Sequence, residues 1–157
     1  MYEASGVGLA ANQVNLGIRL FVMNEAGEKG DGEERVFLNP VVSKPKGSEE
    51  KQEGCLSLPD LYGNVIRPRE VHVQGYNLQG QAYSEVVDGL FGRIIQHESD
   101  HLDGVLFIDR MKEAAREQAS GEIEEFEIEF DAQRKSGEIP DDDTIMKHLA
   151  EIESKFC

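Results

Sequence analysis

The strongest periodic pattern of apolar residues lies between residues 88 and 104. One side of a helix in this segment would carry residues spaced four, three and four apart, namely Leu90, Ile94, His97 and His101. A second apolar side would carry Phe91, Ile95 and Leu102. Because two sides are apolar, the pattern predicts a helix that is buried on most of its circumference. We expect Asp88 to be its N-cap and Gly104 to mark its C-terminal end.

Shorter apolar segments earlier in the chain predict strands. A buried strand is expected within residues 19–24, and two short strands are expected at 36–38 and 41–42, on either side of Asn39-Pro40. None of these segments has the length of a typical helix. They indicate that the first part of the chain is built from strands.

A hairpin is expected next. Valines alternate with polar residues at 71–73, Gln79-Gly80 has the composition of a tight turn, and residues 82–87 would return as the partner strand. The charged, glycine-rich residues 25–34 are expected to form a loop, and residues 44–54 a polar surface connection. Short antiparallel strands packed around one buried helix correspond to an α+β fold.

The last part of the chain has a different composition. Residues 113–157 contain fourteen acidic and five basic residues, so most of the net charge of −15 lies here. Residues 126–130 alternate like a strand, but Ile123, Phe126 and Phe130 could also line one face of a helix, and the pattern leaves both open. A terminal amphipathic helix is indicated by Ile145, Leu149, Ile152 and Phe156. We therefore predict a catalytic domain at 1–112 and a solvated, partly helical acidic extension at 113–157.

Composition limits the class of protein. A chain of 157 residues with 39% hydrophobic and 30% charged residues fits a globular protein with an ordinary core. The net charge of −15 argues against direct binding to nucleic acid or to an anionic membrane. Two distant cysteines do not make a disulfide framework. We expect a cytoplasmic protein.

The predicted helix carries a candidate metal site. His97 and His101 are four residues apart, so their imidazoles lie one turn apart on one face and can hold one cation. Glu98 projects near the same ion without having to bind it. That position suits a general base acting on a water that the metal activates.

Cys55 has three readings. It can be a small core residue, the partner of Cys157 in a disulfide, or a thiolate ligand. Together with His97 and His101, a thiolate would give three ligands and leave a fourth position open. An open position is typical of a catalytic metal and not of a structural one.

The segment at residues 6–13, Gly-Val-Gly-Leu-Ala-Ala-Asn-Gln, also has two readings. It can be a turn that leads into a short helix. It can instead be a loop that faces a substrate, because Gly6 and Gly8 allow another chain to approach closely. In that case its backbone would pair with a peptide, and Gln13 would offer an amide donor to an oxyanion.

Taken together, these three segments resemble the motifs of the peptide deformylase family. The motifs are Gly-Val-Gly-Leu-Ala-Ala-Asn-Gln at 6–13, Glu-Gly-Cys-Leu-Ser at 53–57, and Gln-His-Glu-Ser-Asp-His at 96–101. They occur in the order and at the approximate separations of that family. The resemblance covers roughly residues 1–112.

The resemblance implies an activity: hydrolytic removal of the formyl group from the N-terminal formylmethionine of nascent polypeptides. It also implies one divalent metal, natively Fe²⁺, with Zn²⁺ or Ni²⁺ able to take its place. The partners would be N-formylmethionyl nascent peptides in the bacterial cytoplasm. This implies transient proximity to the ribosome, without contact to nucleic acid or membrane.

The resemblance also implies roles for particular residues. The metal ligands would be Cys55, His97 and His101, and the catalytic acid and base would be Glu98. The groups that hold the oxyanion would be Gln13 and the backbone N–H of Leu56. The substrate would lie against Val7 and Gly8.

The chain departs from the family in four respects. The family's N-terminal strand and helix are missing before Gly6, and Tyr62 stands where some members carry an arginine. Arg93 stands one turn before His97, where some members are apolar, and would narrow or polarise the methionine pocket or face away. The acidic extension replaces a basic helix, and all recognised chemistry precedes Lys112, so we expect removal of the extension to preserve activity. The alternatives are a truncated non-catalytic remnant, or another metallohydrolase with a His-Glu-x-x-His helix.

Overall fold

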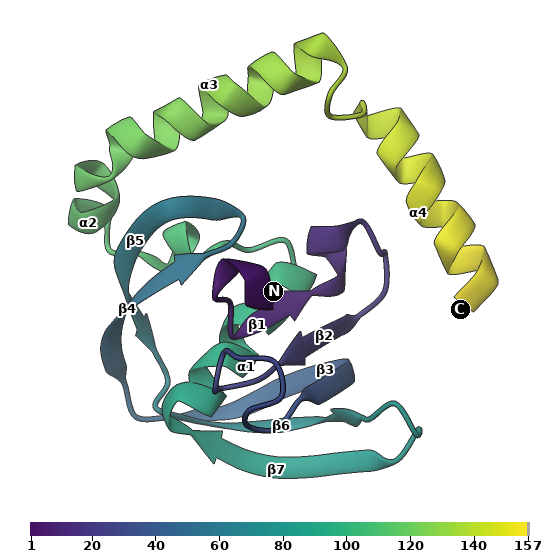
Figure 1. Ribbon diagram of the computed structural model, residues 1–157. Helices are drawn as coiled ribbons and strands as arrows, with labels where there is room; N and C mark the ends of the chain where they lie inside the picture. The colour runs from purple at the N-terminus through teal and green to yellow at the C-terminus, as the bar shows by residue number, and fades with distance from the viewer. Residues whose placement is uncertain (157) are drawn as a thin grey trace.

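The computed structural model describes residues 1–156, and its strands form two antiparallel sheets (Figure 1). The larger sheet has the strand order β1 (Gly8–Ala10), β2 (Leu20–Met23), β3 (Arg35–Lys46), β6 (Glu70–Tyr76) and β7 (Ala82–Asp88). The smaller sheet pairs β4 (Glu49–Cys55) with β5 (Leu58–Arg67). Helix α1 (Gly89–Leu102) lies against the larger sheet. The predicted α+β class, with antiparallel strands around a central helix, is confirmed.

The predicted helix is present with nearly the predicted bounds. Asp88 precedes its first residue, although the Asp88 side chain makes no capping hydrogen bond. Gly104 follows the helix with φ of +73°, a left-handed conformation that glycine adopts without strain. One position differs from the expectation: Leu90 is 49% exposed, because the first turn of the helix reaches the mouth of a cavity.

The core between α1 and the larger sheet follows from alternation in the strands. Side chains at every second position of β2 are buried, and the rings of Phe21 and Phe37 stack with centroids 4.7 Å apart. Ile94 and Ile95 fill the helix side of this core. At about 25 cal/mol per Å² of buried apolar surface, these contacts stabilise the position of the helix that carries the two histidines.

Two of the strand predictions were wrong. The segments 36–38 and 41–42 belong to the single strand β3, which continues through an irregularity at Asn39, where φ is +47°. Residues 44–54 are not a surface connection, because they complete β3 and form β4. The alternating pattern of β5 was not recognised, since its buried series ends in Arg67 and not in an apolar residue.

A second, smaller core lies beneath β5. It contains Leu61, Val65, Phe107, Ile108 and Ala119. Phe107 and Ile108 belong to a 3₁₀ helix, η3 (Phe107–Arg110), that follows α1. Ala119 comes from the acidic extension, so the extension packs against β5 and η3 near its own beginning.

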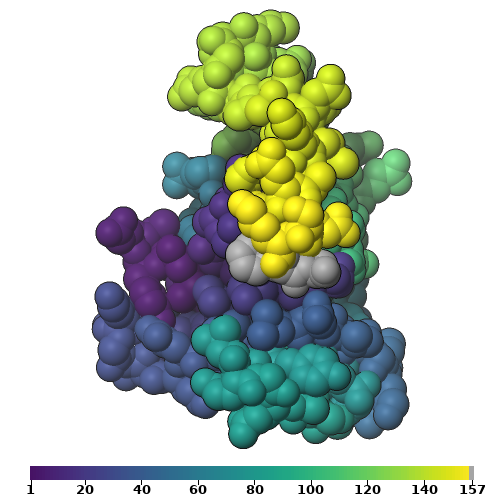
Figure 2. Space-filling model, turned by 90° about the vertical axis from the view of Figure 1, so that its right-hand side faces the viewer, coloured from purple at the N-terminus to yellow at the C-terminus, as the bar shows by residue number. Residues whose placement is uncertain are grey.

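The extension forms three helices: α2 (Glu113–Gln118), α3 (Ser120–Ser136) and α4 (Asp142–Phe156). Residues 126–130 are helical, which decides between the two patterns, and the terminal amphipathic helix is confirmed. In Figure 1, α3 passes above the sheets and α4 returns beside the connection between β1 and β2, and Figure 2 shows α4 over that region from the side. Cys157 lies outside the described residues. Within residues 1–156, no helix combines the length and hydrophobicity that a membrane crossing requires.

Candidate active site

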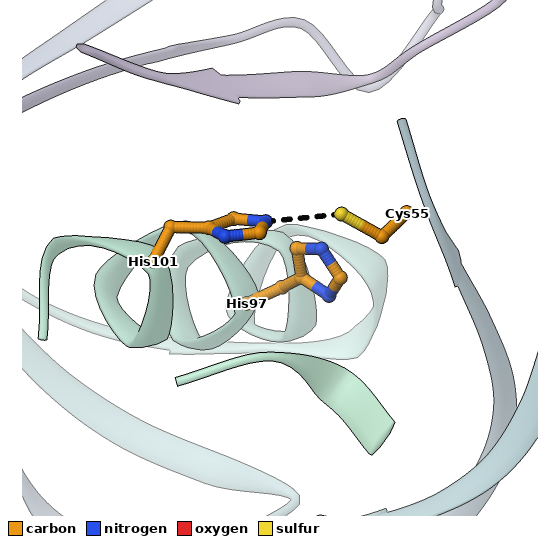
Figure 3. Close-up of side chains that lie close together, drawn as sticks. All are labelled: Cys55, His97 and His101. Carbon is orange, nitrogen blue, oxygen red and sulfur yellow. Dashed lines mark hydrogen bonds between the residues drawn. The ribbon is translucent and has the colours of Figure 1, made fainter. Parts of the chain in front are cut away.

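The structure brings the three predicted ligands together. Cys55 stands at the end of β4, whereas His97 and His101 extend from one face of α1 (Figure 3). The Sγ of Cys55 lies 3.2 Å from Nε2 of His101. Within the described residues, the ligand atoms of these three side chains all lie within 4.8 Å of one another. One thiolate and two imidazoles at this separation match the donor set of a transition-metal site.

A carboxylate orients one of the histidines. Nδ1 of His97 lies 3.0 Å from Oε2 of Glu53. A histidine that gives Nδ1–H to a carboxylate keeps its Nε2 lone pair for a metal, and such contacts fix both the tautomer and the direction of the ring. The contact with Glu53 therefore holds the His97 ring in the orientation that a ligand requires.

Glu53 is itself held by two buried arginines. Nε and Nη2 of Arg67 donate to it at 2.6 and 2.9 Å, and Nη1 of Arg93 donates at 2.6 Å. Arg67 also donates to Asp100 at 2.7 Å, and Asp100 accepts two bonds from Arg110. This chain of ion pairs, which we call the Glu53 network, connects β4 and β5 to helix α1.

The sequence left open whether the side chain of Arg93 enters the pocket or faces away from it. Its guanidinium does not face away: it lines the cavity and donates to the carbonyls of Val65 and Glu49 as well as to Glu53. The side chain is only 8% exposed. Arg93 thus narrows the cavity, and its charge is neutralised by a buried carboxylate.

The charges of Cys55 and His97 depend on each other. Burial raises the pKa of the Cys55 thiol, but hydrogen bonds from His101 and His97 outweigh burial and bring this pKa to about 5. Burial lowers the pKa of His97, but its bonds to Cys55 and Glu53 raise that pKa to about 9. Without a metal, the Cys55 thiolate is therefore stabilised by its hydrogen bonds and by the charged imidazole of His97, and binding of a metal would release the His97 proton.

Glu98 occupies a different environment. The residue is 4% exposed, and its Oε2 has no hydrogen-bond partner among the described residues. Burial raises the pKa of this carboxyl to about 7, although the nearby histidines oppose the rise. A carboxyl with a pKa near 7 can both accept and donate a proton near neutral pH.

Gly8 lies directly against Glu98. A Cβ atom added at Gly8 would be 2.3 Å from Oε1 of Glu98 and 2.7 Å from its Cδ. No side chain fits into that space. Glycine at this position therefore allows β1 to cover the carboxyl of Glu98.

The side chain of Gln13 extends from the 3₁₀ helix η2 (Ala11–Val14) toward Cys55. Its Oε1 accepts a bond from the Ala10 N–H at 2.8 Å, which turns the amide nitrogen toward the second motif. That nitrogen donates to Oγ of Ser57 at 3.0 Å and lies 3.9 Å from Sγ of Cys55. The segment at 6–13 thus contains strand β1 followed by the short helix η2, where the sequence had predicted a turn or a loop, and it lines one side of the cavity.

The candidate residues surround one cavity of about 510 Å³. Among its lining residues are Val7, Gly8, Gln13, Leu56, Tyr62 and Glu98. Tyr62 is 61% exposed, next to Gly54 in the strand pairing. Strand β1 is the edge of the larger sheet, so an extended chain can pair with it.

The model of one protein family, polypeptide deformylase, matches residues 1–117. The chain belongs to the polypeptide deformylase family. As a deformylase it is a metal-dependent hydrolase, and its reaction removes the formyl group from the N-terminal formylmethionine of nascent polypeptides.

Individual deformylases agree with this assignment. The chain is 47% identical to a peptide deformylase of Rhodopirellula baltica over 156 residues, which are 99% of this chain and 78% of that protein. It is 46% identical to a peptide deformylase of Afipia carboxidovorans over 74% of this chain and 69% of that one. The crystal structure of a plant peptide deformylase 1B matches 86% of this chain and 74% of that chain with 40% identity and a TM-score of 0.83.

Sequence reasoning missed the Glu53 network of this deformylase. Glu53 was quoted only as part of a motif, and Arg67, Asp100 and Arg110 were not singled out. One signal was available, because Arg67 ends a strand whose buried positions otherwise carry leucine, glycine and valine. A charged residue at such a position indicates a buried ion pair.

Proposed function

We propose that Cys55, His97 and His101 hold a single divalent metal in this deformylase and that Glu98 is its acid and base. The observation that carries this proposal is the position of Glu98, a buried carboxyl adjacent in sequence to one histidine and covered by Gly8. A carboxyl placed beside three ligands, but outside their set, suits proton transfer better than metal binding.

The donor set fits such a metal. A thiolate and two imidazoles leave a fourth position open, and a bound ion would supply Lewis acidity that lowers the pKa of water to about 7. We propose Fe²⁺ as the native metal, as the family resemblance implies, with Zn²⁺ or Ni²⁺ as substitutes. Glu53 supports this role by holding the His97 ring in the ligating orientation.

Glu98 then carries the proton through the reaction. It takes the proton from the attacking water and gives it to the nitrogen of the leaving amine, so that the free N-terminus departs as a neutral amine. Its dry surroundings and the rise of its pKa to about 7 favour transfer in both directions near neutral pH.

The negative charge that develops on the formyl oxygen is assigned to two donors of this chain. Nε2 of Gln13 and the backbone N–H of Leu56 flank Cys55, from η2 and from the residue after β4. Gln13 is already fixed through its own carbonyl oxygen, so it needs little reorganisation. Loss of one such donor typically costs about 3–4 kcal/mol of transition-state stabilisation.

The substrate is assigned to the cavity along β1. Val7 and Gly8 border it, and the free edge of β1 offers backbone groups to a peptide in extended conformation. We further propose that the protein works in the bacterial cytoplasm, on peptides that emerge from ribosomes it meets transiently. The extension, with a net charge of −9, argues against direct contact with nucleic acid.

Replacement of Glu98 by glutamine tests the central assignment. Glu98→Gln should keep about one metal per chain but lose at least about 10²-fold in kcat, because glutamine cannot exchange the proton. Metal content measured anaerobically, together with turnover of a formylmethionyl peptide, distinguishes the two effects. Loss of metal in this variant, or retained turnover, would contradict the role. Turnover of the unformylated peptide by the wild type would favour another metallohydrolase.

A further inference from the structure

The cavity of this deformylase lies between two walls that belong to different sheets. One wall comes from β1 and η2 and carries Gly8 and Gln13. The other comes from β4 and β5 and carries Leu61 and Tyr62. Helix α1, with His97, joins them at the base. Strands β4 and β5 form a sheet of their own, so within residues 1–156 no strand pairing ties the second wall to the first.

The acidic extension begins on the second wall. Ala119 is 7% exposed and belongs to the core beneath β5, and Ile123 and Phe126 of α3 pack against the same core. Leu61 belongs to that core and also lines the cavity. The first half of the extension is therefore anchored directly behind the β5 side of the substrate site.

The last helix of the extension contacts the segment that follows the first wall in the chain. Figure 1 shows α3 crossing above the sheets and α4 descending beside the connection between β1 and β2. In that connection, Gly17 lies against Leu149 of α4: a Cβ added at Gly17 would be 2.9 Å from Cδ2 of Leu149. Ile152, three residues further along α4, is 8% exposed. The contact is thus made by the apolar stripe of the amphipathic helix.

The segment that Leu149 contacts is the one that positions Gln13. Its ends are tied to the end of α1, because Asn12 donates to the carbonyl of His101 and Arg19 donates to the carbonyl of Leu102 and to Asp103. Gln13 and Gly17 lie between these two ties. A shift of the Gly17 backbone therefore has a short path to the Gln13 amide.

We propose that the acidic extension is a strap across the substrate cleft and that Leu149 is a positioning residue, which acts through Gly17 on Gln13. The strap would join the second wall to the first wall, and within residues 1–156 no strand pairing joins these two walls. This replaces the expectation that the extension is dispensable. The alignment with the Rhodopirellula baltica deformylase includes almost all of the extension, because it covers 156 of the 157 residues.

The first test compares three variants on the same helix. Leu149→Asp should lower kcat by about tenfold at nearly unchanged KM. Complete removal of an oxyanion donor typically lowers kcat by about 10²–10³-fold, and a misplaced donor should cause only part of that loss. Leu149→Met, which keeps an apolar side chain of similar size, should retain most of the wild-type kcat. Met146→Asp, at a position 64% exposed, is the matched control and should behave as wild type. All rates are divided by the metal content, so that a smaller fraction of folded protein does not lower the measured kcat.

A double-mutant cycle tests the same contact without the charge that aspartate introduces at position 149. Gly17→Ala introduces the Cβ that meets Leu149, and Leu149→Ala removes the atoms that it meets, leaving Cβ 3.5 Å away, an ordinary contact. Each single variant should lower kcat by about fivefold, and the double variant should lose clearly less than the product of the two. Additive losses, or unchanged kcat in Leu149→Asp, would overturn the strap.

This inference rests on the proposed role of Gln13, but the two fail differently. If Gln13 has no role in the reaction, Gln13→Ala leaves kcat unchanged. If only the strap is wrong, Gln13→Ala lowers kcat while the Leu149 variants do not.

Discussion

Replacement of Glu53 by glutamine perturbs the structure at the point where the smaller sheet, β4 and β5, meets helix α1. Glutamine keeps the size of the side chain but removes its charge. Arg67 would keep Asp100 as an ionised partner, whereas Arg93 would keep only neutral acceptors, among them the carbonyls of Val65 and Glu49. An amide nitrogen would also face donors, because every group around Glu53 donates a hydrogen bond to it.

The loss of stability can be worked out from the pKa of Glu53. Burial raises this pKa, but hydrogen bonds from His97 and Arg67 outweigh burial and bring it from 4.5 to about 2. At 1.36 kcal/mol per pH unit, this corresponds to about 3 kcal/mol at neutral pH. The side chain is only 5% exposed, so solvent screening does not reduce this value much. Removal of one partner from a buried pair typically costs about 3–5 kcal/mol, which agrees.

The same pKa predicts how the loss depends on pH. A carboxyl whose folded pKa is lowered stabilises the protein above its unfolded pKa, and this contribution disappears as pH falls from about 4.5 toward 2. The wild type should therefore lose about 2 kcal/mol of this contribution between pH 7 and pH 3. Glu53→Gln lacks the titrating group, so the difference between the two proteins should shrink by that amount.

Urea unfolding of the metal-free proteins at pH 7 and pH 3 measures both effects, because removal of the metal separates the ion pairs from metal binding. Glu50→Gln is the matched control: Glu50 lies on the same strand but pairs with Lys112 at the surface, so its loss should cost less than about 1 kcal/mol. A difference between wild type and Glu53→Gln below about 1 kcal/mol at pH 7, or one that stays constant down to pH 3, would refute the reasoning.

Two further predictions concern the site itself. Cys55→Ser should lose metal and activity together, measured by anaerobic metal analysis and turnover, since a hydroxyl replaces a thiolate poorly; Cys157→Ser is the control and should change neither. Gly8→Ala should lower kcat by at least about tenfold while metal stays bound, because its Cβ would displace the carboxyl of Glu98. Gly121→Ala, where an added Cβ meets nothing within 4 Å, should leave kcat unchanged, and a normal kcat in Gly8→Ala would contradict the steric role.

The parts of the structure that the sequence predicted are those encoded by local patterns. Helix α1 was predicted because its apolar periodicity and its ends are properties of about fifteen neighbouring residues. The grouping of Cys55 with His97 and His101 was implied by the family resemblance, because the residues alone left three readings open for Cys55. Residues 126–130 could not be assigned, since five residues that alternate in polarity fit both a strand and one face of a helix.

The parts that the sequence did not predict depend on distant partners. Strand β4 carries Glu49, Glu50, Lys51, Gln52 and Glu53, which as a local pattern indicates a solvated loop. It becomes a strand because β5 pairs with it, and Glu53 becomes buried because Arg67 and Arg93 neutralise it. The contact between Leu149 and Gly17 spans most of the chain, and no periodicity within either segment announces it.

The Glu53 network raises the question why the centre of this protein is held by charges. A well-packed apolar cluster of the same volume would be as stable or more stable, because desolvation of buried ions consumes much of their attraction. Stability therefore does not explain the network, but the orientation that the network imposes on the His97 ring does. An ionised carboxylate has about four acceptor positions. Nε of Arg67 and Nη1 of Arg93 bind Oε1, and Nη2 of Arg67 and Nδ1 of His97 bind Oε2. The arginines occupy three positions and leave one, so the His97 ring has a single direction in which its Nδ1–H is satisfied, and that direction leaves its Nε2 free for the metal that we propose.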